Sequence, residues 1–115
     1  MSANKVQPIP AGMHTVTPHL VVNDAPAAID WYVKAFGAVE NSRLTAPDGK
    51  VLHAQITIGD SPVMFFEEVA ECNAFSPITL KGTPVSLHIY VEDVDSAFER
   101  AVKAGAEVIM PPMDM

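Results

Sequence analysis

The sequence has one cysteine and few basic residues, and each scarcity excludes a class of protein. Cys72 is the single cysteine among 115 residues, so neither a disulfide framework within the chain nor a thiolate zinc site is expected. Lys and Arg total 7 against 14 Asp and Glu, a formal net charge of −7. Such a chain lacks the basic surface that binds nucleic acid or an anionic membrane. We therefore expect neither partner.

Long hydrophobic runs are also missing. No apolar stretch approaches the roughly 18–20 residues that a membrane-spanning helix needs. Pro8, Pro10 and Gly12 interrupt the beginning of the chain, so no signal-peptide core is expected there. Together with the lone cysteine, this predicts a cytoplasmic protein. The 49% of hydrophobic residues are nevertheless enough to form the core of one small domain.

The first half of the chain predicts one helix among four strands. Residues 17–22 alternate as a strand does. Asp24 is a suitable N-cap for the amphipathic helix that follows, and Gly37 is suited to end it. Three more strands are expected, separated by turns rich in Gly, Asp and Pro: residues 39–45, 51–58 and 62–68.

The second half begins with a segment that has no clear hydrophobic period. Residues 69–84 predict a long loop of the kind that often covers a binding site. Residues 85–91 alternate and predict a strand. A further helix is expected between Asp93 and Gly105, and residues 107–110 begin another predicted strand.

The two halves repeat one pattern of a strand histidine, a capping aspartate and a terminating glycine. His19, Asp24 and Gly37 correspond to His88, Asp93 and Gly105, and such a repeat largely determines the fold. We predict an α+β fold of paired β-α-β-β-β modules that form a half-barrel cleft, with the second module apparently truncated. The expected organisation is a lead-in at residues 1–14 and a single domain at 15–115, divided into module one (15–68), a loop (69–84) and an incomplete module two (85–115).

One strand face is expected to line the cleft between the modules. We assign every second side chain of each predicted strand to the face away from the helices. These side chains are mostly polar, with a few apolar residues among them, as in small-molecule sites. For any single strand, the alternative is that these polar side chains simply face the solvent and line no site. The predicted ligand-binding residues are Thr17, Gln55, Thr57, Phe65, Ser86 and Tyr90.

The chain resembles the vicinal oxygen chelate superfamily, which includes glyoxalase I, bleomycin-resistance proteins, fosfomycin-resistance enzymes and extradiol dioxygenases. The resemblance rests on residues 18–37 and on residues 86–105, and it extends over residues 15–112. It implies paired β-α-β-β-β modules, with two more strands expected after Met115. It also implies metal-ligand positions at Thr17, near Phe65 and at Ser86, none of which carries a usual ligand in this sequence.

His19, Glu67 and His88 each lie two residues from those implied positions, and a shift of two residues keeps a side chain on the same face of a strand. Two imidazoles and a carboxylate can hold Zn²⁺, Mn²⁺, Fe²⁺ or Ni²⁺. The hypothesis is therefore a displaced divalent-metal site, with Glu67 also as a candidate catalytic base. The alternative is that both histidines are pocket-wall or hydrogen-bonded core residues.

We expect the chain to bind a small organic molecule in the cleft between the modules. The resemblance implies either a metal-dependent lyase, isomerase, transferase or dioxygenase, or a non-catalytic protein that sequesters a drug or metabolite. An incomplete second module would expose a sheet edge, which favours pairing with another copy. The chain is therefore predicted to form a homodimer.

Overall fold

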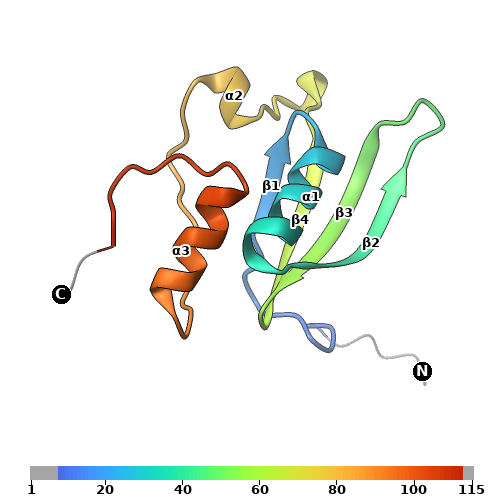
Figure 1. The fold of residues 1–115 in the computed structure, drawn as a ribbon. Helices are drawn as coiled ribbons and strands as arrows, with labels where there is room; N and C mark the ends of the chain where they lie inside the picture. The colour runs from blue at the N-terminus through green and yellow to red at the C-terminus, as the bar shows by residue number, and fades with distance from the viewer. Residues whose placement is uncertain (1–7, 113–115) are drawn as a thin grey trace.

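The computed structural model describes residues 8–112, and a four-stranded sheet lies at its centre. The elements of the first half follow the order β1 (His19–Val22), α1 (Ala25–Phe36), β2 (Val39–Thr45), β3 (Val51–Ile58) and β4 (Ser61–Glu67). The strands lie in the order β1-β4-β3-β2 (Figure 1). This arrangement confirms the predicted α+β class and the predicted β-α-β-β-β unit.

Helix α1 begins and ends where its sequence predicts. The side chain of Asp24 accepts a hydrogen bond from the Ala27 N–H at 3.1 Å, which satisfies one of the free N–H groups of the first turn. Pro26 lies in that turn, where a missing N–H costs nothing. Gly37 ends the helix with a φ of 68°, in the left-handed region that glycine adopts without strain.

The core lies between α1 and one face of the sheet. Ala54 of β3 pairs with Phe65 of β4, and the rings of Phe65 and Tyr32 lie 5.6 Å apart between their centroids. Burying such apolar side chains stabilises the fold by about 1.5–3 kcal/mol for each large one. The buried cluster consists of Ala25, Ile29, Ala38, Val51, Ala54, Ile56, Val63 and Phe65.

The faces of β4 differ from the expected assignment. Phe65 was predicted to face the cleft, but it is fully buried under α1, and Glu67 lies on that same side. That prediction is wrong because residues 63–66 are apolar without interruption, so alternation cannot assign the two faces of this strand. Met64 and Phe66 instead share the open face with His19.

The segment between β4 and the second half has more structure than the predicted loop. It contains a short 3-10 helix, η1 (Ala70–Cys72), and one helical turn, α2 (Pro77–Leu80). Ser76 caps α2 through its hydroxyl, which accepts from the Thr79 N–H at 3.2 Å. The backbone N–H of Ser76 donates to Glu68 at 2.6 Å, so the segment is tied back to the end of β4.

The second half contains a helix without the predicted strands. Helix α3 (Val94–Lys103) forms as expected, with Asp93 as its N-cap. Residues 85–91 and 107–110 form no strand within the described residues 8–112, so both strand predictions are wrong there. A segment of alternating apolar and polar residues forms a strand only where a neighbouring strand completes the hydrogen-bond ladder. Residues 85–91 lead to α3 without such a neighbouring strand. One module is therefore complete in residues 8–112.

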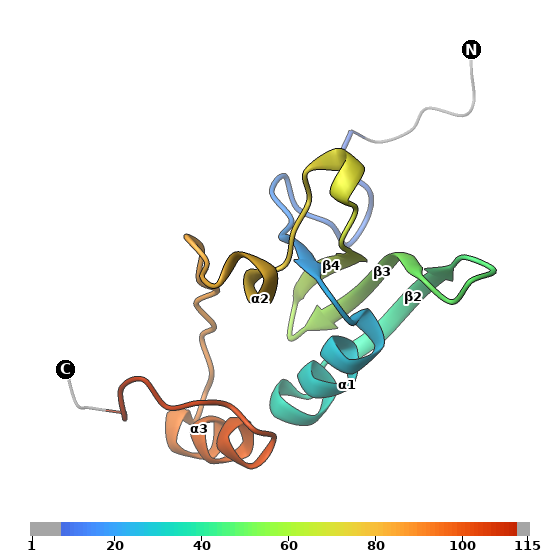
Figure 2. The same cartoon turned by 90° about the horizontal axis from the view of Figure 1, so that it is seen from above.

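Helix α3 packs beside α1 rather than on the sheet (Figures 1 and 2). The extended segment that leads to α3 starts at α2 and runs past the β1 side of the sheet (Figure 2). Within residues 8–112, no helix combines the length and the apolar character that a bilayer crossing requires.

Candidate functional site

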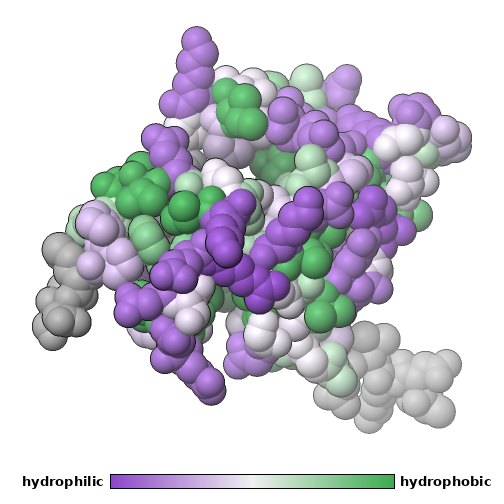
Figure 3. All heavy atoms as spheres, in the orientation of Figure 1, coloured by the Kyte–Doolittle hydropathy of each residue, from purple (hydrophilic) through white to green (hydrophobic). Residues whose placement is uncertain are grey.

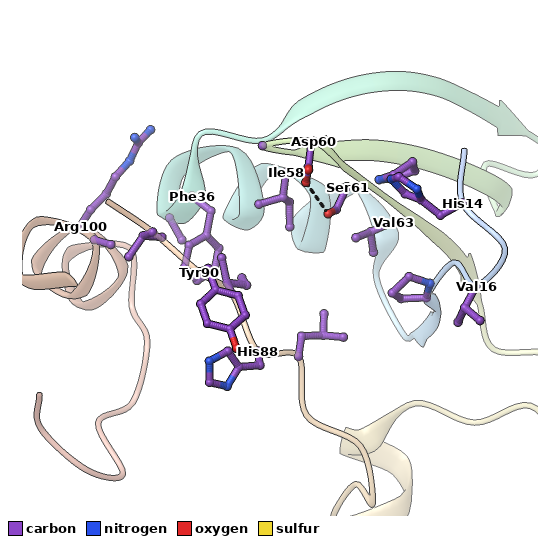
Figure 4. A pocket seen from close by; sticks show the side chains of 18 of the residues that line it. His14, Val16, Phe36, Ile58, Asp60, Ser61, Val63, His88, Tyr90 and Arg100 are labelled. Carbon is purple, nitrogen blue, oxygen red and sulfur yellow. Dashed lines mark hydrogen bonds between the residues drawn. The ribbon is translucent and has the colours of Figure 1, made fainter. Parts of the chain in front are cut away.

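A pocket of about 890 Å³ lies where the end of the sheet, the end of α1 and α3 meet (Figure 4). We call it the α1–α3 pocket. Its volume falls within the range of about 300–1,000 Å³ that is usual for small-molecule sites. Its lining residues are His14, Val16, Pro18, Ala35, Phe36, Ile58, Gly59, Asp60, Ser61, Pro62, Val63, Leu87, His88, Ile89, Tyr90, Val91, Ser96, Ala97 and Arg100.

The walls of the α1–α3 pocket are largely apolar. Phe36 comes from the end of α1, whereas Ile58 and Val63 come from β3 and β4 (Figure 4). Opposite them, the rings of His88 and Tyr90 lie together, with centroids 4.8 Å apart. Tyr90 is 90% exposed, so its ring is free to cover a bound molecule. An aromatic ligand would find both apolar contact and ring stacking here.

Polar groups at the rim are few and mostly engaged. The Ser61 hydroxyl donates to the Asp60 carboxylate at 2.8 Å, at the turn between β3 and β4. The Nε of Arg100 donates to the Lys34 carbonyl at 2.7 Å, and its Nη2 donates to the Val33 carbonyl at 3.4 Å. These carbonyls belong to the last turn of α1, where free acceptors and the helix dipole favour a cation. Arg100 therefore fastens α3 to α1 and fixes one wall of the pocket.

The structure brings only part of the predicted ligand-binding set to the α1–α3 pocket. Tyr90 lines it, together with the candidate metal ligand His88. Gln55 and Thr57 lie on the open face of β3, where the Thr57 hydroxyl donates to Asn41 at 2.6 Å. Thr17, Ser86 and the buried Phe65 do not line it either. The pocket residues Phe36 and Arg100 were missed, because both look like ordinary helix residues in the sequence.

The predicted metal ligands are not brought together. Both carboxylate oxygens of Glu67 are used structurally: one accepts from the Ala25 N–H at 2.9 Å and the other from the Val51 N–H at 2.8 Å. Within residues 8–112, no three His, Cys, Asp or Glu side chains lie close enough to share a metal ion. The set His19, Glu67 and His88 therefore does not fit a metal ion, because Glu67 faces α1 rather than the open face.

The open face of the sheet carries a second group of side chains, in which the predicted metal ligand His19 meets residues outside the predicted site. The ring of His19 lies edge-on to those of His53 and Phe66, with centroids 5.5 and 4.8 Å apart. Partial burial lowers the pKa of His19, and the nearby charge of His53 lowers it further. His53 was not among the predicted site residues, because its contact with His19 depends on strand register.

Comparison with known proteins defines the class of protein. Residues 12–115 match the family described as the Glyoxalase/Bleomycin resistance protein/Dioxygenase superfamily. Since the match includes the sheet, α1 and α3, the chain belongs to this superfamily.

The chain is also similar to proteins of two mycobacterial species. Uncharacterized proteins of Mycobacterium bovis and Mycobacterium tuberculosis are 48% identical over 97 residues, which is 82% of this chain. The chain spans only 64% and 57% of their respective lengths.

Three crystal structures share the fold. A gene product from Arabidopsis thaliana has a TM-score of 0.69 and 24% identity, and the match covers 87% of this chain and 80% of that one. TioX from a Micromonospora species has a TM-score of 0.61 and 26% identity, over 89% and 79% of the two chains. The fosfomycin resistance protein FosX from Listeria monocytogenes, complexed with Mn(II) and sulfate, has a TM-score of 0.55 and 15% identity, over 82% and 73%.

Proposed function

We propose that the chain binds a small organic molecule in the α1–α3 pocket and acts as a binding protein. The observation that carries this proposal is an apolar pocket of about 890 Å³ with the His88–Tyr90 ring pair opposite Phe36 and Val63. Concave apolar sites with a few polar groups are the usual form of small-molecule sites.

The lining favours an uncharged ligand with an aromatic ring. Asp60 and Arg100 are the formally charged residues of the lining, and each already has a hydrogen-bond partner. Burying a neutral polar group without a hydrogen-bond partner costs about 2–7 kcal/mol, and burying an unpaired ligand charge would cost more. A planar aromatic group can instead stack against Tyr90 and His88.

Binding is favoured over catalysis because the candidate base is engaged elsewhere. Glu67 accepts two backbone N–H groups beneath α1, and it is not among the residues that line the pocket. The superfamily description includes both enzymes and resistance proteins, and the site agrees better with the second kind.

We also propose that two copies associate through the second half of the chain. Val85 and Ile109 are 62% and 87% exposed, and hydrophobic atoms gather over the C-terminal segment on the face shown in Figure 3. Exposed apolar patches favour association. Analytical ultracentrifugation should show a dimer that Ile109→Asp dissociates; a wild-type monomer at all concentrations would contradict this part of the proposal.

The binding proposal is tested with Nile red, an uncharged polycyclic dye. Ala97 and Ala101 are both half-buried on α3, but only Ala97 lines the pocket. Ala97→Phe should therefore fill the pocket and weaken dye binding at least tenfold, while Ala101→Phe binds like the wild type. Circular dichroism checks that both variants fold. Equal affinity of the two variants, or no saturable binding to the wild type, would contradict the proposal.

A further inference from the structure

The open sheet face presents two imidazoles at a separation that suits a shared ligand. His19 is at the start of β1 and His53 is near the start of β3, and their ring centroids are 5.5 Å apart at an interplanar angle of 83°. His19 is exposed and His53 is half-buried, so solutes reach the pair from the solvent. These residues are separate from the α1–α3 pocket and from the buried cluster beneath α1.

The separation agrees with coordination of one ion by both rings. Imidazole nitrogens bind a transition-metal ion at about 2.0–2.1 Å, so two rings on one ion lie within about 6 Å of each other. Phe66 packs against His19 with a centroid distance of 4.8 Å. That contact limits the positions of the His19 ring, which reduces the ordering cost of binding.

Met64 lies beside His19 on this face, and a second methionine lies next to Gln55. Met64 is the register partner of His19 on one side and of Gln55 on the other, so the three side chains share the open face. The Sδ of Met13 lies 3.8 Å from the Nε2 of Gln55. Imidazole suits Cu²⁺, Ni²⁺ and Zn²⁺, thioether sulfur selects Cu⁺, and carboxylates would favour Mg²⁺ or Mn²⁺.

We propose that His19 and His53 form a bidentate site for an imidazole-seeking transition-metal ion, with Cu²⁺ bound more tightly than Ni²⁺ or Zn²⁺. The order follows from the general ranking of divalent ions on nitrogen ligands. Water completes the coordination sphere on the solvent side. The site combines one residue of β1 with one of β3 inside a single module, so it differs from the displaced set of His19, Glu67 and His88.

The four histidines of the sequence provide a matched test. Metal-free protein is titrated with Cu²⁺ alone by isothermal calorimetry, and electron paramagnetic resonance reports the bound nitrogens. The wild type should bind one Cu²⁺ per chain with two imidazole nitrogens. His19→Gln and His53→Gln should each weaken binding at least tenfold, while the control variant His14→Gln/His88→Gln keeps wild-type affinity.

A measurement on the wild type does not depend on how the variants fold. Zn²⁺, which is diamagnetic, should shift the ring resonances of His19 and His53 in NMR spectra and leave those of His14 and His88 in place. Cu²⁺ affinity that is unchanged in His19→Gln or His53→Gln, or lost equally in the control, would overturn the proposal. So would Zn²⁺-induced shifts at His14 or His88 instead.

Discussion

The Nε of Arg100 donates a hydrogen bond to the carbonyl oxygen of Lys34 at 2.7 Å, and this bond joins α3 to the last turn of α1. The two residues are far apart in the sequence, one in each half of the repeat. Helix α3 has no fully buried residue, so this bond adds a directed polar contact to the partly exposed packing between α1 and α3.

Removing the side chain of Arg100 should loosen α3. Arg100→Ala loses a hydrogen bond from a charged donor, which is worth about 1.5–3 kcal/mol in general and less on an exposed helix. We expect a lower free energy of urea unfolding and at least threefold weaker Nile red binding. Arg43→Ala is the control, because Arg43 pairs with Glu40 at 2.7 Å on the surface, where such pairs contribute about 0–1 kcal/mol. Equal dye affinity in both variants would contradict this role of Arg100.

The backbone conformation of Gly37 favours glycine, and the guanidinium of Arg100 lies close to it. Its φ is +68°, and an added Cβ would lie 3.3 Å from the Nη1 of Arg100. Gly37→Ala should destabilise the protein by about 1–2 kcal/mol, measured by urea unfolding. Gly82→Ala is the matched control, because an added Cβ there meets nothing within 4 Å. A Gly37→Ala variant as stable as Gly82→Ala would refute this preference for glycine.

Glu67 should matter for stability. Its carboxylate accepts from the N–H groups of Ala25 and Val51, so it connects the start of α1 to the start of β3. Glu67→Gln replaces one acceptor oxygen by an NH₂ group that faces a backbone donor, and we expect a cost of about 1–3 kcal/mol. Glu71→Gln on the exposed turn of η1 serves as the control. Thermal unfolding of the two variants at the same temperature would argue against the connecting role.

The segment from β4 to α2 should weaken in acid. The Thr79 hydroxyl, followed by the backbone N–H and hydroxyl of Ser76, lowers the pKa of Glu68 from its ordinary value of 4.5. A carboxylate with a lowered folded-state pKa stabilises the fold above its unfolded-state pKa, and this stability is lost as the pH falls through the folded-state pKa. Unfolding midpoints measured above and below pH 4.5 should therefore fall in acid, and Glu68→Gln should reduce the fall. An identical pH dependence in Glu68→Gln would contradict the assignment.

Local signals in the sequence predicted the elements that local chemistry determines. Asp24 and Gly37 mark the ends of α1, and Asp93 marks the start of α3, because capping depends on residues within a few positions. The repeat of these caps also indicated the superfamily correctly. The same signals did not reveal that residues 85–91 and 107–110 form no strand within the described residues.

Features that depend on distant partners were not predictable from the sequence. The faces of β4 are ambiguous because Met64 and Phe65 are both large and apolar, so only packing under α1 decides which is buried. The contact between His19 and His53 depends on the parallel pairing of β1 with β4. The wall formed by Arg100 depends on a bond between the two halves, which no local pattern indicates.

The most direct test of the central claim is NMR mapping of Nile red on the wild-type protein. Binding in the α1–α3 pocket predicts that the dye shifts the resonances of Phe36, Val63 and Tyr90, which come from three separate segments and line one hollow. The resonances of Thr57 and Phe66, on the open sheet face, should stay in place. Saturable shifts confined to the open face, or no saturable shifts at all, would contradict the claim that this chain binds small organic molecules between α1 and α3.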